Sequence, residues 1–181
     1  MAYKEINTFA FFNASAVRYM KIALKKEEGY AFDLMSVMVM SAFSVEAYFN
    51  HLGAKKFANW FKLYERKSVW EKYKILRSVV GLNELSIAQA YPDVAEVLDF
   101  RNSMAHGRSE KHELDFFIDP ELVECLDQPV GWQAKLDETI VSLRLKACQD
   151  LIKELHEAAA LGKHPFFALS SSTSFTSIVT L

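Results

Sequence analysis

The chain has 181 residues, a net charge of −2 and 51% hydrophobic residues, with only six Gly and four Pro. This length is typical of one domain with a sizeable core, and the composition excludes a disordered chain. The near-neutral charge gives no general attraction to nucleic acid. The two cysteines, Cys125 and Cys148, are too few and too far apart for a disulfide framework or a metal knuckle, so we expect a reducing, cytoplasmic compartment.

We expect no signal peptide and no membrane-spanning segment. The first five residues are polar, and the apolar run at residues 9–12 is too short for a signal peptide. The most apolar stretch, residues 34–45, spans 12 residues between Asp33 and Glu46. A helix needs about 20 apolar residues to cross a bilayer, so this stretch is predicted to be a buried helix.

The first half of the chain has the spacing of apolar residues that is typical of helices. Steps of three and four predict a helix over residues 6–26, which Gly29 follows. The next helix is predicted over residues 30–52 and is apolar on nearly every side, so we expect it in the middle of a bundle or at a dimer interface. Ser68 is predicted to cap a third helix, which Gly81 ends.

The second half is predicted to add two longer helices. A short helix or connector over residues 83–91 leads to Pro92, which suits the first turn of a helix. Residues 113–119 fit a short extended segment, and the last helix is predicted over residues 132–160. The chain is therefore predicted to be an all-α bundle of about five helices over residues 1–163. The predicted apolar stripe of the last helix consists of Ile140, Leu143, Ala147, Leu151, Leu155 and Ala158.

Residues 164–181 form a Ser/Thr-rich C-terminal tail with little helical character. Three alternatives fit it: an extended strand docked on the bundle, a segment that binds a partner, or a disordered end. All three remain open at this point.

Residues 54–77 carry the local positive charge, with eight basic residues and two acidic ones, interleaved with aromatic residues. Basic and aromatic side chains together suit single-stranded RNA, by phosphate contact and base stacking. The alternative is that the aromatic residues belong to the core and the lysines to a solvated face, and the helical spacing of Trp70, Tyr73, Leu76 and Val80 favours it. The residues predicted to bind RNA are Lys55, Lys56, Arg66, Lys67 and Lys72.

Residues 110–138 have the opposite charge, with nine acidic residues and two lysines. This acidic strip either pairs with the basic segment or repels RNA. Both alternatives remain open.

Three polar residues, Arg101, Asn102 and His106, lie at the end of the helix that begins at Pro92. Asn102 and His106 share a helix face because they are four residues apart, whereas Arg101 and His106 point about 140° apart. Gly107 is predicted to end the helix. A guanidinium for a phosphate, an imidazole that moves a proton near pH 7 and an amide that orients one of them are suited to RNA cleavage.

This arrangement resembles the motif of the HEPN family (higher eukaryotes and prokaryotes nucleotide-binding), in which Arg is followed after four to six residues by His. A polar residue often comes directly after the Arg. Arg101, Asn102 and His106 match the four-residue form. Residues 44–50 (SVEAYFN) resemble the long Glu-bearing helix of the family, and the resemblance covers residues 6–162.

The resemblance implies an HEPN-like helical bundle and, where the family is active, metal-independent cleavage of RNA by a homodimer. The two motifs would meet across the dimer interface in one composite site. His106 would move the proton, Arg101 would stabilise the phosphoryl oxygens and Asn102 would orient His106 or the phosphate. The products would be a 2′,3′-cyclic phosphate and a 5′-hydroxyl, with no metal or cofactor, and the implied roles are stress or anti-phage defence.

One position departs from a toxin branch of the family. That branch carries a Tyr two residues after the motif His, which a partner nucleotidyltransferase modifies. Arg108 occupies this position, so no such partner is implied. Arg108 is predicted to add a phosphate contact instead.

In the alternative, Arg101 pairs with a carboxylate, His106 caps a helix end, and the chain is a non-catalytic module that dimerises and binds RNA or a protein partner. Glu46 is the carboxylate we expect beside Arg101, because a carboxylate on a mostly buried helix needs a partner. Otherwise Glu46 meets solvent at the helix end. Asn50 shares the face of Glu46, and the many-sided apolar character of the helix over residues 30–52 predicts a homodimer.

Overall fold

The computed structural model describes residues 2–107, 131–166 and 177–180. Within these residues seven α-helices form a bundle, with one 3-10 helix and two short strands. The all-α bundle is therefore confirmed, and five of its helices exceed ten residues. The elements are β1 (Ala2–Glu5), α1 (Thr8–Ala23), α2 (Tyr30–Lys56), α3 (Trp60–Tyr64), α4 (Val69–Val79), α5 (Ile87–Ala90), α6 (Pro92–Ala105), η2 (Gly131–Lys135), α7 (Glu138–Ala158) and β2 (Ser177–Thr180).

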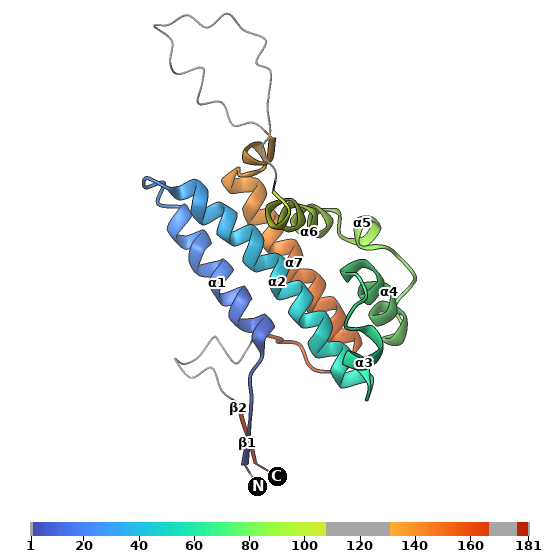
Figure 1. The fold of residues 1–181 in the computed structure, drawn as a ribbon. Coiled ribbons are helices and arrows are strands. Elements are labelled where there is room, and N and C mark those ends of the chain that lie inside the picture. The colour runs from blue at the N-terminus through green and yellow to red at the C-terminus, as the bar shows by residue number, and fades with distance from the viewer. Residues whose placement is uncertain (1, 108–130, 167–176, 181) are drawn as a thin grey trace, which may run out of the picture.

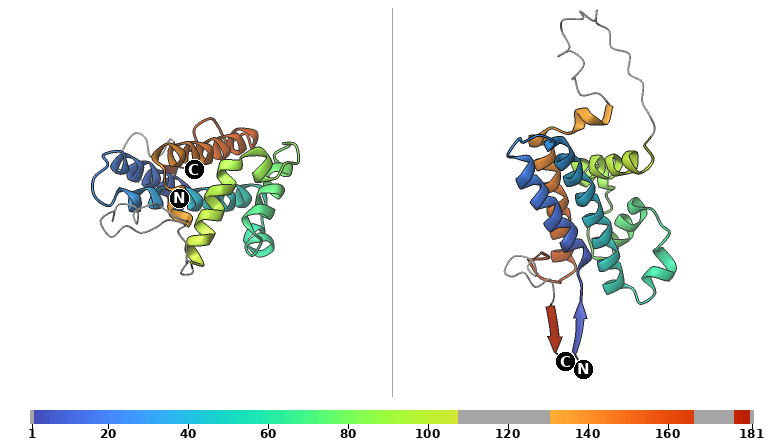
Figure 2. Two further views of the ribbon diagram at one scale, coloured as in Figure 1. Left: turned by 90° about the horizontal axis from the view of Figure 1, so that it is seen from above. Right: turned by 60° about the vertical axis from the view of Figure 1, so that its left-hand side comes forward.

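The helix α2 is the centre of the bundle. It contacts α1, α3, α4, α6 and α7, and the three long helices α1, α2 and α7 lie side by side (Figures 1 and 2). The helix α6 packs against α2 and α7, while α3 and α4 lie beside the C-terminal half of α2 (Figure 1). Five neighbouring helices of the same chain therefore cover the apolar side chains of α2. The apolar composition of α2 does not require a dimer interface.

By length and composition, α2 is also the one helix among the described residues that could cross a membrane. Half of its most apolar window is buried inside the bundle. A core helix has the same composition, so α2 is weak evidence for a membrane segment.

Local sequence explains the starts of the two helices that flank the predicted site. The Ser68 hydroxyl accepts a hydrogen bond from the backbone N–H of Glu71, and the Glu71 carboxylate accepts one from the backbone N–H of Ser68. This reciprocal cap satisfies two N–H groups at the start of α4. Pro92 occupies the first turn of α6, where its missing N–H costs nothing.

The last helix begins later than predicted. Residues 131–135 form the 3-10 helix η2, and Asp137 caps α7 by accepting hydrogen bonds from the backbone N–H groups of Thr139 and Ile140. An N-cap residue has a non-helical backbone, so a well-capped helix starts after its capping residue. The apolar spacing over residues 132–136 does not indicate that the α-helix starts only after Asp137.

The predicted apolar stripe of α7 is wrong in its first half. Ile140 and Leu143 are 40% and 58% exposed, respectively. The sequence offers two overlapping stripes, about 100° apart around the helix, and packing against α2 and α6 decides which one is buried. The buried residues of α7 are Val141, Leu145, Cys148, Leu151, Ile152 and Leu155.

At residues 164–166 and 177–180, where the structure describes the C-terminal tail, it is non-helical, as predicted. Its residues Ser177–Thr180 form β2, which pairs antiparallel with β1 so that Ala2 lies opposite Thr180 (Figure 2). Nearer the bundle, Pro165 is buried and the ring of Phe166 lies 6.1 Å from that of Phe9. The predicted extended segment over residues 113–119 lies outside the described residues.

Candidate functional site

The helix α6 carries the three motif residues at its C-terminal end. Arg101 and Asn102 lie within the helix, and His106 is its C-terminal capping residue. The backbone N–H of His106 donates to the carbonyl of Asn102 at 3.1 Å. The motif therefore sits where the helix ends, as the sequence predicts, with Gly107 directly beyond it.

Arg101 forms the predicted ion pair with Glu46. Its guanidinium Nη2 contacts the Glu46 carboxylate Oε1, and the two side chains are 21% and 31% exposed, respectively. Among the described residues, the Nε atom of Arg101 is buried without a hydrogen-bond partner. Burial lowers the pKa of Arg101 from its ordinary value, although a guanidinium stays cationic at neutral pH. Arg101 therefore pairs with Glu46 while part of its side chain stays exposed.

A polar cavity of about 360 Å³ opens beside this ion pair. We call it the Arg101 cavity. Three elements line it: α2, the segment from the end of α3 into α4, and α6. Of the predicted site residues, it brings together Arg101, Asn102, Glu46, Asn50, Lys67 and Lys72.

Asn50 links the cavity to the core. Its Oδ1 accepts hydrogen bonds from Lys72 Nζ at 3.0 Å and from Trp60 Nε1 at 3.3 Å. Two donors on the same atom fix the orientation of the amide, with Oδ1 toward Lys72 and Trp60. Desolvation lowers the pKa of Lys72, while the carboxylate of Glu65 acts in the opposite direction. The cavity therefore holds a partly buried cation in a fixed position.

Lys67 is held at the cavity by the start of α4. Its Nζ donates to the Glu71 carboxylate at 2.9 Å. This hydrogen bond and those from Ser68 lower the pKa of Glu71 to about 2. The N-terminus of α4 thus faces the Arg101 cavity, with Lys67 and the positive end of the helix dipole together.

The remaining residues predicted to bind RNA are dispersed. Lys56 Nζ donates to the backbone carbonyl of Ala159 at 3.0 Å, so it is tied to the end of α7. Lys55 lines a different cavity, and Arg66 is exposed outside the lining of the Arg101 cavity. Arg108 lies outside the described residues. Of the five residues predicted to bind RNA, Lys67 and Lys72 therefore line the Arg101 cavity.

The aromatic residues of the same segment divide between core and surface. Trp60 and Tyr73 are fully buried, which agrees with the core alternative. Trp70 is half-buried and lines the Arg101 cavity, and Phe61 is 54% exposed. The cavity is also lined by residues that were not predicted as site residues: Glu65, Ser68, Val69 and Trp70. Their closeness to Lys67 and Lys72 in the sequence was the one signal that pointed to them.

His106 is exposed and is not among the described residues that line the Arg101 cavity. One copy of the chain therefore presents the guanidinium inside a cavity and the imidazole outside it. A single copy does not direct both groups at one ligand atom within this cavity.

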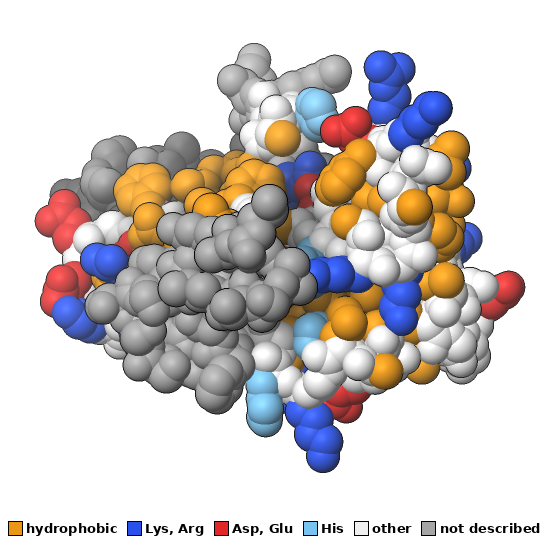
Figure 3. Space-filling model, turned by 90° about the horizontal axis from the view of Figure 1, so that it is seen from below, with side chains coloured by type: hydrophobic (Ala, Val, Ile, Leu, Met, Phe, Trp, Pro, Cys, Tyr) orange, Lys and Arg blue, Asp and Glu red, His pale blue; other side chains and the backbone are white. Residues whose placement is uncertain are grey.

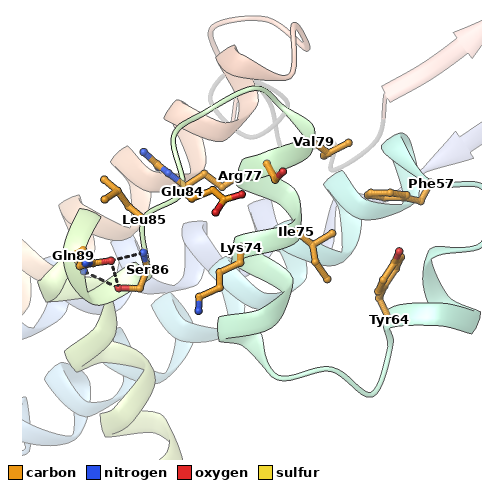
Figure 4. Close-up of a pocket in the computed structure, with 11 residues that line it drawn as sticks. Phe57, Tyr64, Lys74, Ile75, Arg77, Val79, Glu84, Leu85, Ser86 and Gln89 are labelled. Atoms are coloured by element: carbon orange, nitrogen blue, oxygen red, sulfur yellow. Dashed lines mark hydrogen bonds between the residues drawn. The ribbon is translucent and has the colours of Figure 1, made fainter.

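A larger cavity, of about 630 Å³, lies among α4, α5 and their connection, with Phe57 and Tyr64 at its other end (Figure 4). None of the predicted site residues lines it. It borders Arg77, whose donors are engaged by Tyr73, Asn83 and Glu154. Its size alone does not connect it with the motif chemistry.

Among the described residues, no group of three or more His, Cys, Asp or Glu side chains is placed to hold a metal ion. The predicted metal-independent chemistry and the absence of a cofactor stay predictions.

No protein-family model, curated protein or solved structure matches this chain. The resemblance to the HEPN family therefore rests on the residues that carry the motif and on residues 44–50.

Proposed function

We propose that this chain is a metal-independent endoribonuclease that cleaves single-stranded RNA through a composite site of the HEPN type, in stress or anti-phage defence. One observation carries the proposal: Arg101 and Asn102 share a polar cavity with Lys67 and Lys72, and His106 lies exposed at the end of the same helix. The protein works in the cytoplasm and needs no membrane and no cofactor.

The proposed reaction is an attack by the ribose 2′-OH on the adjacent phosphorus. The 2′-oxygen forms a bond to phosphorus, the bond to the 5′-oxygen breaks, and the products are a 2′,3′-cyclic phosphate and a 5′-hydroxyl. His106 takes the proton of the 2′-OH or returns one to the leaving oxygen. Arg101 stabilises the charge that develops on the phosphoryl oxygens, with Asn102 as the orienting group.

The position of His106 supports a homodimer. Because His106 of one copy lies outside the cavity that holds its own Arg101, a complete site needs both residues from facing copies. Two motifs around one scissile phosphate would supply two guanidiniums and two imidazoles.

Charge on the cavity wall supports an RNA ligand. Arg101, Lys67 and Lys72 come from three different parts of the fold, and the N-terminus of α4 adds partial positive charge. Glu46 and Glu65 line the same cavity, and Glu71 pairs with Lys67, so these carboxylates offset part of this charge. Binding of a phosphate there should weaken as salt concentration rises.

The Arg101–Glu46 ion pair also favours a second candidate function. In this candidate the pair joins α6 to α2 as a structural contact, and His106 only ends a helix. The chain is then a non-catalytic helical module that dimerises and binds RNA or a protein partner.

A cleavage assay separates the two candidates. The wild type is incubated with single-stranded RNA in the presence of EDTA, beside Arg101→Ala and His106→Ala. We expect either substitution to lower the cleavage rate by about 100-fold or more, since each removes a group that acts in the transition state. Arg18→Ala and His164→Ala change exposed residues far along the chain from the motif and serve as matched controls with unchanged rates.

No cleavage by the wild type across a broad panel of RNAs would support the non-catalytic module. Cleavage that survives both motif substitutions would mean that the motif is not the site. Light scattering on the same samples gives the oligomeric state, and a monomeric mass at micromolar concentration contradicts the composite site.

A further inference from the structure

A third cavity, of about 550 Å³, lies between the start of α1, the C-terminal half of α2 and α3. We call it the Phe61 cavity. Two large apolar side chains from different segments line it and remain exposed: Ile6 at 58% and Phe61 at 54%. Single exposed apolar residues are ordinary, but two at one cavity form a surface that an apolar or aromatic ligand group can cover.

The polar residues of the Phe61 cavity come from the same stretch of α2 that lines the Arg101 cavity. Asn50, His51 and Lys55 line it, together with Thr8 from the start of α1. Seen from the end of the bundle at which α3 lies, the surface carries hydrophobic, basic and histidine side chains beside one another (Figure 3). Apolar rings next to hydrogen-bonding groups suit a flat, polar-edged ligand group.

Asn50 lines both cavities. Its Oδ1 is committed to Lys72 and Trp60, so its Nδ2 is the end of the amide that can donate to a ligand. The region of α3 also borders both cavities: Phe61 of α3 lines the Phe61 cavity, and Glu65, the residue directly after α3, lines the Arg101 cavity. The two cavities are therefore neighbours along one surface of α2 and α3.

We propose that the Phe61 cavity binds a nucleobase of single-stranded RNA, next to the phosphate held in the Arg101 cavity. The Phe61 ring lies against the face of the base, and the Asn50 amide donates to its edge. This inference rests on the proposed RNA substrate, and it adds to the proposed function a base-binding subsite outside the Arg-Asn-His motif.

Alternation of chemistry along the surface favours RNA over an apolar peptide. A cation-lined cavity beside an aromatic one matches a strand in which charged phosphates alternate with flat bases. An apolar peptide would cover Ile6 and Phe61 but would not use Arg101, Lys67 and Lys72 in the neighbouring cavity. Stacking on one Phe is tolerant of sequence, so we expect a broad base preference.

Binding of a short fluorescein-labelled single-stranded RNA tests the subsite, in His106→Ala protein so that the RNA stays intact. We expect Phe61→Ala to weaken binding about 5- to 100-fold and Phe61→Tyr to keep it within about twofold, because Tyr preserves the stacking face. Leu63→Ala is the matched control: Leu63 lies on the same helix, is 59% exposed and does not line the Phe61 cavity. It should leave the affinity unchanged.

RNA with abasic sites gives a readout that does not depend on protein folding. It should bind the parent protein more weakly than intact RNA, and Phe61→Ala should cause no further loss. If the parent binds RNA while Phe61→Ala and Leu63→Ala have the same affinity, the base subsite is overturned and the RNA function stands. If the parent binds no single-stranded RNA, the proposed function fails and this inference fails with it.

Discussion

Two arginines of this protein each pair with a glutamate, yet their surroundings differ. Arg77 is almost fully buried and donates to the Tyr73 hydroxyl at 2.9 Å, to Glu154 at 2.8 Å, and to the backbone and side-chain oxygens of Asn83 at 2.7 Å each. Arg101 contacts Glu46, keeps a buried Nε without a partner among the described residues, and borders a polar cavity.

The hydrogen-bond partners and the exposure of the two side chains distinguish a structural arginine from a candidate binding residue. Buried polar groups are normally satisfied, because an unsatisfied donor costs free energy. Arg77 meets this rule with Nε, Nη1 and Nη2 all engaged, so it holds α4 to α7. Arg101 instead lines a polar cavity, where the exposed part of its guanidinium can pair with a phosphate.

The largest effect is expected when the two arginines are each replaced by Ala. Arg77→Ala should lower the free energy of unfolding by about 3 kcal/mol, because it leaves several buried polar groups unpaired. Arg101→Ala should lower it by about 1 kcal/mol or less, because its ion pair is partly exposed. Urea unfolding followed by circular dichroism measures both. Equal losses would remove the distinction and favour a structural Arg101.

A smaller effect is expected when the two glutamates are each replaced by Gln. Glu46→Gln should cost at most about 1 kcal/mol of stability and should raise the affinity for single-stranded RNA a few-fold, because it removes a negative charge from the Arg101 cavity. Glu154→Gln should cost more stability, since Arg77 beside it is nearly fully buried, and should leave RNA affinity unchanged. A drop in RNA affinity for Glu46→Gln would instead assign Glu46 the task of positioning Arg101.

The smallest effect is expected from the pH dependence of stability at a histidine. His156 is half-buried, with its Nδ1 3.2 Å from the Tyr48 hydroxyl, and desolvation lowers its pKa from the ordinary value of 6.5. Below this value the unfolded chain binds a proton that the folded chain resists, so His156 contributes stability above about pH 6.5 that is lost as the pH falls further.

Unfolding free energies measured between pH 8 and pH 5 test this contribution. Replacement of His156 by Gln should flatten part of the decline toward acidic pH, because it removes this titrating group. An unchanged profile for His156→Gln would show that other groups cause the decline.

The helical class, the main helices and several of their starts and ends follow from the sequence, although α7 begins later than its apolar spacing predicts. The Ser68–Glu71 cap, Pro92 in the first turn of α6 and the end of that helix at His106 all depend on residues within one turn of each other. The sequence also indicated the correct partner for Arg101, because a carboxylate on a buried helix requires a cation.

Apart from the Arg101–Glu46 pair, the contacts between side chains across the bundle became evident in the tertiary structure. It selected the buried stripe of α7, placed Arg77 in the interior, tied Lys56 to α7 and gathered Lys67 and Lys72 beside Arg101. These outcomes depend on the rotation and contact of helices that are distant in the sequence. Periodicity fixes which residues share a face of one helix, but only packing between helices fixes what that face touches.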